Sequence, residues 1–419
     1  MGLWAWPVLL LSSLAAGLAL VVILIVPRRW DLVALLVLAL LLTIGSQGLL
    51  SLWGRPGRTE VVLAATALAL GAAAGGYALG AALLARHRVR LRPVVIEPPA
   101  DPVAGHPAQA VVLLASAEPA HYRFDTVCAE FGDLADAGVP LPPDMVLPLF
   151  YAASRDSYRA LGSSDAPGAA GRIAKRLERL LAEAGCDPTK VCVALTGAPP
   201  RLAEVVAELA REGVSRAVVV PLSVGASFRT DKALSELDAA HPGTAGVSVT
   251  DVAARWGACG IPELIADRVT RVTHVPRPAT GVVLVSEGRP DPWDRVQPDA
   301  AHEETFVVQK VRALLAEAGF DAARIVHASL EWRDPDAADA ASILFESGCP
   351  QVIVAPATIP VDGTSTIVDL KHLARRVARK RASEMTVLPA WGDDPAVAGA
   401  LLDAVRPVLS ASMEAGAPS

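Results

Sequence analysis

The sequence contains no asparagine and only five cysteines among its 419 residues. Without asparagine there is no N-glycosylation sequon, because the acceptor side chain is missing. No two cysteines form a CxxC pair; they are Cys128, Cys186, Cys192, Cys259 and Cys349. Scattered thiols in odd number are typical of a reducing compartment and not of a disulfide framework.

Several catalytic signatures are also missing. The chain has no P-loop, no GxGxxG after a predicted strand, no GxSxG and no HExxH. These absences argue against the nucleotide-binding, hydrolase and zinc-protease classes that use those motifs. The histidines of the second half are distributed over different predicted elements, and no two have the i, i+4 spacing of a helical zinc site.

Charge is unevenly distributed along the chain. Residues 1–92 contain eight arginines and two acids, a net +6, and the whole chain carries −6, which leaves −12 for the remainder. An acidic body argues against nucleic acid as a partner, because nucleic-acid binding requires a basic face.

Three uncharged apolar runs occupy the basic N-terminal part: Leu3–Val26, Leu32–Trp53 and Val61–Ala85. Each has about the 20 residues that a bilayer-spanning helix needs. The sequence therefore predicts a three-helix transmembrane anchor over residues 1–92. A glycine- and alanine-rich centre at Gly71–Gly76 predicts close packing of the third helix against another.

The arginines predict the orientation of this anchor. On one side of the membrane would lie the two arginines between the first and second runs, Arg28 and Arg29, and the four that follow the third run, Arg86, Arg88, Arg90 and Arg92. The opposite side would have only two arginines, Arg55 and Arg58. By the positive-inside rule we expect a multi-pass inner-membrane protein with its C-terminal domain in the cytoplasm and membrane lipid as a partner.

A proline-rich linker over 93–107 leads to alternating strand and helix patterns, which predict parallel sheets covered by helices. The pattern repeats at an offset of 135, where Pro200 matches Pro335 and Gly213 matches Gly348. Trp256-Gly257 matches Trp391-Gly392 at the same offset. The predicted fold class is α/β, with two similar Rossmann-like lobes over 108–275 and 276–419 and a ligand cleft between them.

The first lobe is longer than the second by about 36 residues between its first two strands, within His121–Gly168. An insertion after the carboxyl end of a strand overhangs the place where α/β sheets bind ligands. We therefore expect this insertion to form a lip over the binding site.

The stretch Val282–Pro290 reads as a buried strand that ends in Ser286, Glu287 and Gly288. Because ligands of open α/β sheets lie at the carboxyl ends of strands, Glu287 is a candidate for chemistry. The alternative interpretation is that Glu287 caps a turn or pairs with an arginine.

An ordered set of motifs over nearly all of 108–410 resembles the two-lobed chelatases, which include ferrochelatase and the cobalt and sirohydrochlorin chelatases. The motifs are Val193–Pro200, Ser227–Thr230, Val285–Pro290, which falls on the family signature S-x-H-G-x-P, Val354–Asp369 and Trp391–Pro395. The resemblance implies insertion of a divalent metal, most simply Fe²⁺, into a tetrapyrrole in haem or related biosynthesis.

This sequence departs from the family where the chemistry takes place. The signature histidine, which in ferrochelatases accepts a pyrrole proton or holds the entering metal, is Glu287 here, and a later family glutamate falls on Ser365. Acidic residues persist at Asp362 and Asp369. The resemblance thus implies catalytic roles for Glu287 and Asp362 and metal contacts for Glu287, Asp362 and Asp369, an oxygen-rich set that suits hard divalent ions.

Tetrapyrrole contacts are predicted at Trp293, His302, Ser227 and Thr230, which follow strand ends. No tightly bound cofactor is expected, because the metal would be a substrate. The alternative is a non-catalytic, membrane-anchored protein that binds a tetrapyrrole or a metal as a carrier, sensor or scaffold.

Overall fold

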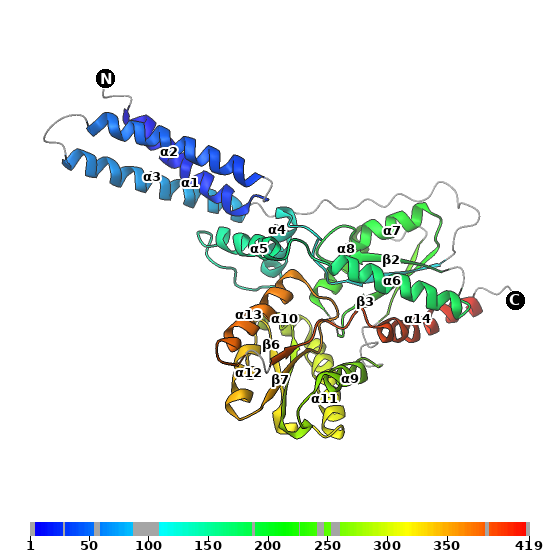
Figure 1. The fold of residues 1–419 in the computed structure, drawn as a ribbon. Coiled ribbons are helices and arrows are strands. Elements are labelled where there is room, and N and C mark those ends of the chain that lie inside the picture. The colour runs from blue at the N-terminus through cyan, green and yellow to red at the C-terminus, as the bar shows by residue number, and fades with distance from the viewer. Residues whose placement is uncertain are drawn as a thin grey trace. The chain divides into compact units, whose positions relative to one another are not determined.

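The structure is a computed structural model that describes residues 5–27, 30–53, 59–86, 109–186, 189–225, 227–240, 247–252, 260–381 and 385–415. The predicted linker 93–107, Trp256-Gly257 and, apart from Arg86, the arginines used to predict orientation lie outside this range. The chain forms two units (Figure 1). Unit 1 comprises Met1–Leu91 and His121–Ser163, and unit 2 comprises Arg92–Ala120 and Ser164–Ser419.

Unit 1 begins with three helices that are long and apolar enough to cross a membrane. They are α1 (Ala5–Ile25), α2 (Asp31–Trp53) and α3 (Thr59–Arg86). Their ends lie within two residues of the predicted runs. The apolar composition therefore sufficed to predict these helices.

Helices α1 and α3 approach each other closely through glycine. A Cβ atom added to Gly76 would overlap the backbone oxygen of Leu14, and one added to Gly17 would overlap that of Ala73. No larger residue fits at either position without a shift of backbone. The predicted close packing of Gly71–Gly76 is thus confirmed for Gly76, in the manner expected of small residues between apolar helices.

The insertion after the first strand also belongs to unit 1. It forms α4 (Phe124–Asp136) and α5 (Leu147–Leu161). Leu147 and Tyr151 on α5 join a buried apolar cluster with Val21 of α1 and Leu84 of α3. We expected a lip over the ligand site. Within unit 1 this segment packs against α1 and α3 through the apolar side of α5, and the lip stays a prediction.

Unit 2 contains two four-stranded parallel sheets with equivalent strand orders, β2-β1-β3-β4 and β6-β5-β7-β8. The strands are β1 (Gln109–Ala115), β2 (Thr189–Leu195), β3 (Arg216–Leu222), β4 (Ser248–Asp251), β5 (Thr280–Ser286), β6 (Ile325–Ser329), β7 (Gln351–Pro356) and β8 (Met385–Val387). The predicted α/β fold of two similar lobes is confirmed. The repeat holds locally too: Gly213 and Gly348, which follow equivalent helices, have φ angles of 81° and 86°.

Helices cover both faces of these sheets. They are α6 (Ala166–Glu183), α7 (Leu202–Arg211), α8 (Phe228–Ala240), α9 (Ile261–Val272), α10 (Asp291–Val296), α11 (Pro298–Glu317), α12 (Ala337–Glu346), α13 (Thr364–Arg381) and α14 (Pro395–Ala415), with short 3₁₀ turns at Arg277–Ala279 and Ala322–Arg324. The pattern is that of a parallel sheet whose crossovers are helical.

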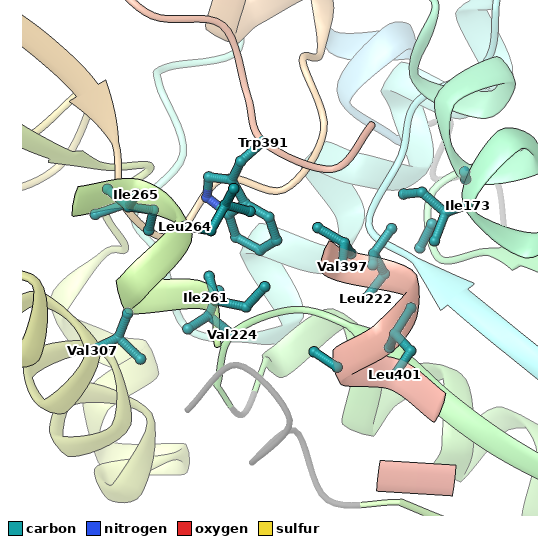
Figure 2. Packing of buried hydrophobic residues seen from close by; sticks show 14 of the residues in the cluster. Ile173, Leu222, Val224, Ile261, Leu264, Ile265, Val307, Trp391, Val397 and Leu401 are labelled. Carbon is teal, nitrogen blue, oxygen red and sulfur yellow. The ribbon is translucent and has the colours of Figure 1, made fainter. Parts of the chain in front are cut away.

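The last helix of each lobe packs on the other lobe. Helix α9 contacts α11 and β7, whereas α14 contacts α6 and β3. The two sheets consequently share one apolar core, in which Trp391 lies beside Ile261 and Leu264 of α9 (Figure 2). The helix layers of the two repeats therefore interleave, and the boundary at residue 275 stays a prediction.

Candidate functional site

The carboxyl end of β5 is built around a glycine turn. The whole strand is buried, and the next residue, Glu287, is exposed. Gly288 has φ = 87°, and a Cβ atom there would overlap the backbone oxygen of Glu331. The Glu331 N–H donates to the Glu287 carbonyl at 3.1 Å. Because only glycine fits this turn, the sequence places the carboxylate of Glu287 at the surface where the internal strand β5 ends.

A histidine on the adjacent strand contacts the last residue of β5. His327, on the neighbouring strand β6, is 39% exposed, and its Nε2 lies 2.8 Å from the Oγ atom of buried Ser286. The same nitrogen lies 3.8 Å from a carboxylate oxygen of Glu304 on α11. Burial lowers the pKa of His327, Arg289 lowers it further, and Glu304 opposes both. The imidazole is therefore neutral at pH 7 and able to accept a proton.

This arrangement is not a nucleophilic relay. Such a relay needs the acid on one ring nitrogen of the histidine and the nucleophile on the other. Here Ser286 and Glu304 both approach Nε2, and Ser286 has no exposed surface. The group is suited to exchange of protons and not to attack on a substrate.

Ion pairs connect the loop after β5, which contains Glu287, to the loop after β6. Arg289 pairs with Glu304 at 3.1 Å and with Asp294 at 2.8 Å. Arg333, from the loop after β6, pairs with Asp294 and donates to the backbone oxygen of Arg289 at 2.9 Å. Burial alone would raise the pKa of Asp294, but hydrogen bonds from the two arginines bring it below its ordinary value. The two arginines thus favour the ionised form of Asp294 beside the site.

The other two predicted carboxylates have different neighbours. Both oxygens of Asp362 accept from the Ala390 N–H, at 3.1 and 3.2 Å. Burial raises the pKa of Asp362, and that N–H and Arg268 oppose the shift. Burial likewise raises the pKa of Asp369, against the effect of His372. Each is thus a stronger base than an ordinary carboxylate.

Within the described part of the chain, no group of three or more histidine, cysteine, aspartate or glutamate side chains is placed to hold a metal ion. Glu287, Asp362 and Asp369 therefore do not form a preassembled three-ligand centre. Their individual roles toward a metal stay predictions.

Three of the predicted tetrapyrrole contacts meet at a junction between the lobes. The ring of Trp293 stacks on Phe228 of α8, with centroids 5.2 Å apart and planes at 23°. Ser227 and Thr230 flank Phe228 in sequence, and Thr230 is buried. One face of Trp293 is thus covered by protein. Its Nε1 is buried without a hydrogen-bond partner among the described residues.

The fourth predicted contact and a further tryptophan are exposed. His302 lies on α11 with its Nδ1 3.2 Å from the Pro298 carbonyl. Trp332 follows Glu331 in the loop after β6, is 52% exposed and has φ = 65°. A left-handed conformation is costly for a bulky residue, so the surrounding loop must hold the backbone at this position.

The lobes are joined at a second, equivalent junction. Glu118, which follows β1, accepts from the backbone N–H of Thr364 and from its hydroxyl, the latter at 2.6 Å. Thr364 begins α13, the helix that carries Asp369. A carboxylate of the first lobe therefore caps a helix of the second, where the helix dipole favours negative charge.

No family model and no curated protein matches the chain. Two solved structures are similar. SirB from Bacillus subtilis with Fe³⁺ has 12% identity and a TM-score of 0.43, and the match covers 73% of this chain and 97% of SirB. DR2241 from Deinococcus radiodurans, a multi-domain protein described as structurally similar to chelatases with two additional novel domains, has 14% identity and a TM-score of 0.42. That match covers 71% of this chain and 54% of DR2241. Because both TM-scores are below 0.5, the assignment of the fold depends on the strand order and the internal repeat.

Proposed function

We propose that unit 2 inserts a divalent metal, most simply Fe²⁺, into a tetrapyrrole at the carboxyl end of β5. The observation that carries the proposal is an exposed carboxylate, Glu287, that directly follows Ser286, whose hydroxyl lies 2.8 Å from the imidazole of His327 on the adjacent strand. Metal insertion requires acceptors for two pyrrole protons, and these two groups supply them. The motifs that resemble the two-lobed chelatases support the same substrate class.

The two bases have different advantages. Glu287 is exposed and accessible to an entering cation, but a carboxylate is ordinarily a weak base. His327 is the better proton acceptor near pH 7 because burial keeps its imidazole neutral. Glu304, held by Arg289, stabilises the imidazolium once a proton arrives. Asp362 and Asp369, with raised pKa values, are proposed to guide metal or protons to the site.

The surroundings of Glu287 suit a flat aromatic ligand. Trp332 presents an exposed ring in the loop that contacts Gly288. A tetrapyrrole has a large aromatic face, and stacking on tryptophan stabilises such faces. Trp293, His302, Ser227 and Thr230 remain proposed contacts, with Trp293 acting from its face opposite Phe228.

The proposal is tested with the full chain in detergent, supplied with Fe²⁺ or Co²⁺ and a porphyrin, by the change in porphyrin absorbance. We expect turnover that Glu287→Ala reduces strongly. His327→Gln should reduce turnover at neutral pH and above, where the wild-type imidazole is neutral and able to accept a proton. A matched control is Glu346→Ala, an exposed glutamate on α12. Equal inertness of the wild type and of all variants would contradict the enzyme proposal.

One observation favours a second candidate function. Because no three-ligand group exists among the described residues, the protein holds no preassembled metal centre there. A carrier or sensor that binds a tetrapyrrole without metalating it needs no such centre. Tight porphyrin binding without any change of the bound metal would support this function over the first.

We further propose that α1–α3 anchor unit 2 to the cytoplasmic face of a cell membrane. Their length and apolar composition support membrane insertion. The arginine distribution of the sequence supports the orientation. The test is protease treatment of sealed inner-membrane vesicles: unit 2 should be digested in inverted vesicles and protected in right-side-out vesicles, and the reverse result would contradict it.

A further inference from the structure

An apolar surface is exposed at the start of α5. Met145, Val146, Leu149 and Phe150 are between 37% and 56% exposed. They lie in a stretch, residues 145–154, that contains no charged side chain. On its other side α5 is buried against α1 and α3 through Leu147 and Tyr151. This helix therefore carries two apolar sides, and protein covers only one of them among the described residues.

The position of this surface is set by a hydrogen bond to α3. The Tyr77 hydroxyl donates to the Met145 carbonyl at 3.0 Å. Tyr77 precedes the last residue of α3, Arg86, by nine positions, or about 13 Å along the helix axis. Met145 thus lies beside the apolar length of α3 and not beyond its end. Leu79 and Leu83, nearer to Arg86, are exposed on another side of α3, so the apolar surface of α3 extends past this depth.

The second half of α5 is polar and contacts the end of the apolar helices. Buried Arg155 donates to the Ile23 carbonyl in the last turn of α1, where backbone oxygens lack helical partners. Arg159 pairs with Asp31, the first residue of α2. Tyr122, before α4, donates to the Ile25 carbonyl at 3.0 Å. These contacts belong at the polar boundary of a bilayer.

We propose that the surface formed by Met145, Val146, Leu149 and Phe150 is buried among lipid acyl chains. Helix α5 enters the bilayer boundary obliquely, with its first turns at acyl depth and Arg155 and Arg159 at the headgroups. Lipid is the expected occupant because Met145 lies beside the apolar length of α3, at a depth where lipid acyl chains surround that helix. The inference rests on the proposal that α1–α3 cross a membrane.

The test places the photoreactive residue p-benzoylphenylalanine at one position at a time in the full chain. The protein is reconstituted in vesicles of phosphatidylcholine and phosphatidylglycerol and irradiated, and lipid adducts are measured by mass spectrometry. The test position is Phe150. Leu36, which is 61% exposed on α2, reports insertion of the apolar helices, and exposed Ala160 at the other end of α5 is the matched control.

We expect lipid adducts at Phe150 and Leu36, with about tenfold less at Ala160. Adducts at Leu36 but not at Phe150 would overturn this inference and leave the membrane anchor intact. No adduct at Leu36 would refute the anchor and the inference together. Cross-links from Phe150 to a second copy of the chain would show a protein interface and also overturn it.

Discussion

Replacing Glu118 by alanine removes the contact that joins the carboxyl end of β1 to the start of α13. Two donors of Thr364, its backbone N–H and its hydroxyl, lose their acceptor. Thr364 is 2% exposed, so water does not replace the lost carboxylate without rearrangement. An unsatisfied buried donor costs about 1–3 kcal/mol, and the two donors share one partner, so we expect a loss of about 2–4 kcal/mol in unfolding free energy.

The assay is urea unfolding of the full chain in detergent, followed by tryptophan fluorescence. Glu346→Ala removes an exposed carboxylate of the second lobe and should change the free energy of unfolding by less than about 0.5 kcal/mol. Thr364→Val removes the hydroxyl alone. A double-mutant cycle with Glu118→Ala should give a coupling energy of about 1.5 kcal/mol for that one charged hydrogen bond. Equal midpoints for Glu118→Ala and Glu346→Ala would refute the cross-lobe cap.

Further predictions use matched positions. Gly288→Ala should destabilise by about 1–3 kcal/mol more than Gly319→Ala in urea unfolding, because both glycines have positive φ but only Gly288 meets a backbone oxygen. Gly76→Ala should lower the thermal midpoint in detergent, whereas Gly75→Ala, with open space around its Cβ, should not; equal midpoints would contradict the α1–α3 contact. The pKa of Asp362 is raised in the folded state, so ionisation of this carboxyl opposes folding. The stability that the protonated carboxyl contributes is therefore lost as pH rises from about 3.8 through the folded-state pKa. Asp362→Asn should therefore flatten the stability–pH curve in that window, and an unchanged slope would contradict the shift.

The topology was predictable because the signals that determine it are local. The offset of 135 pairs β3 with β7, and both lobes adopt the strand order that the repeat implies. The three apolar helices were equally clear, since uncharged runs of that length have few other structural solutions. The turn at Gly288 was visible as well, because a strand that runs directly into glycine predicts a sharp change of direction.

The contacts that assemble the site were not predictable from one sequence. Ser286 and His327 are 41 residues apart, and their hydrogen bond depends on which strand neighbours β5. The position of the insertion in the sequence was predictable, but the helices against which it packs were not. Arg155 of the insertion, for example, donates a hydrogen bond to the Ile23 carbonyl, 132 residues away. The hydrogen bond between Glu118 and Thr364, which are 246 residues apart, is another long-range contact of this kind.

The measurement that tests the central proposal most directly is a structure of the full chain with a porphyrin bound. The account predicts a macrocycle at the carboxyl end of β5, with its pyrrole nitrogens within hydrogen-bonding reach of Glu287, about 3 Å, and its face near Trp332. A porphyrin bound elsewhere on the molecule, with Glu287 and His327 remote from it, would contradict the account.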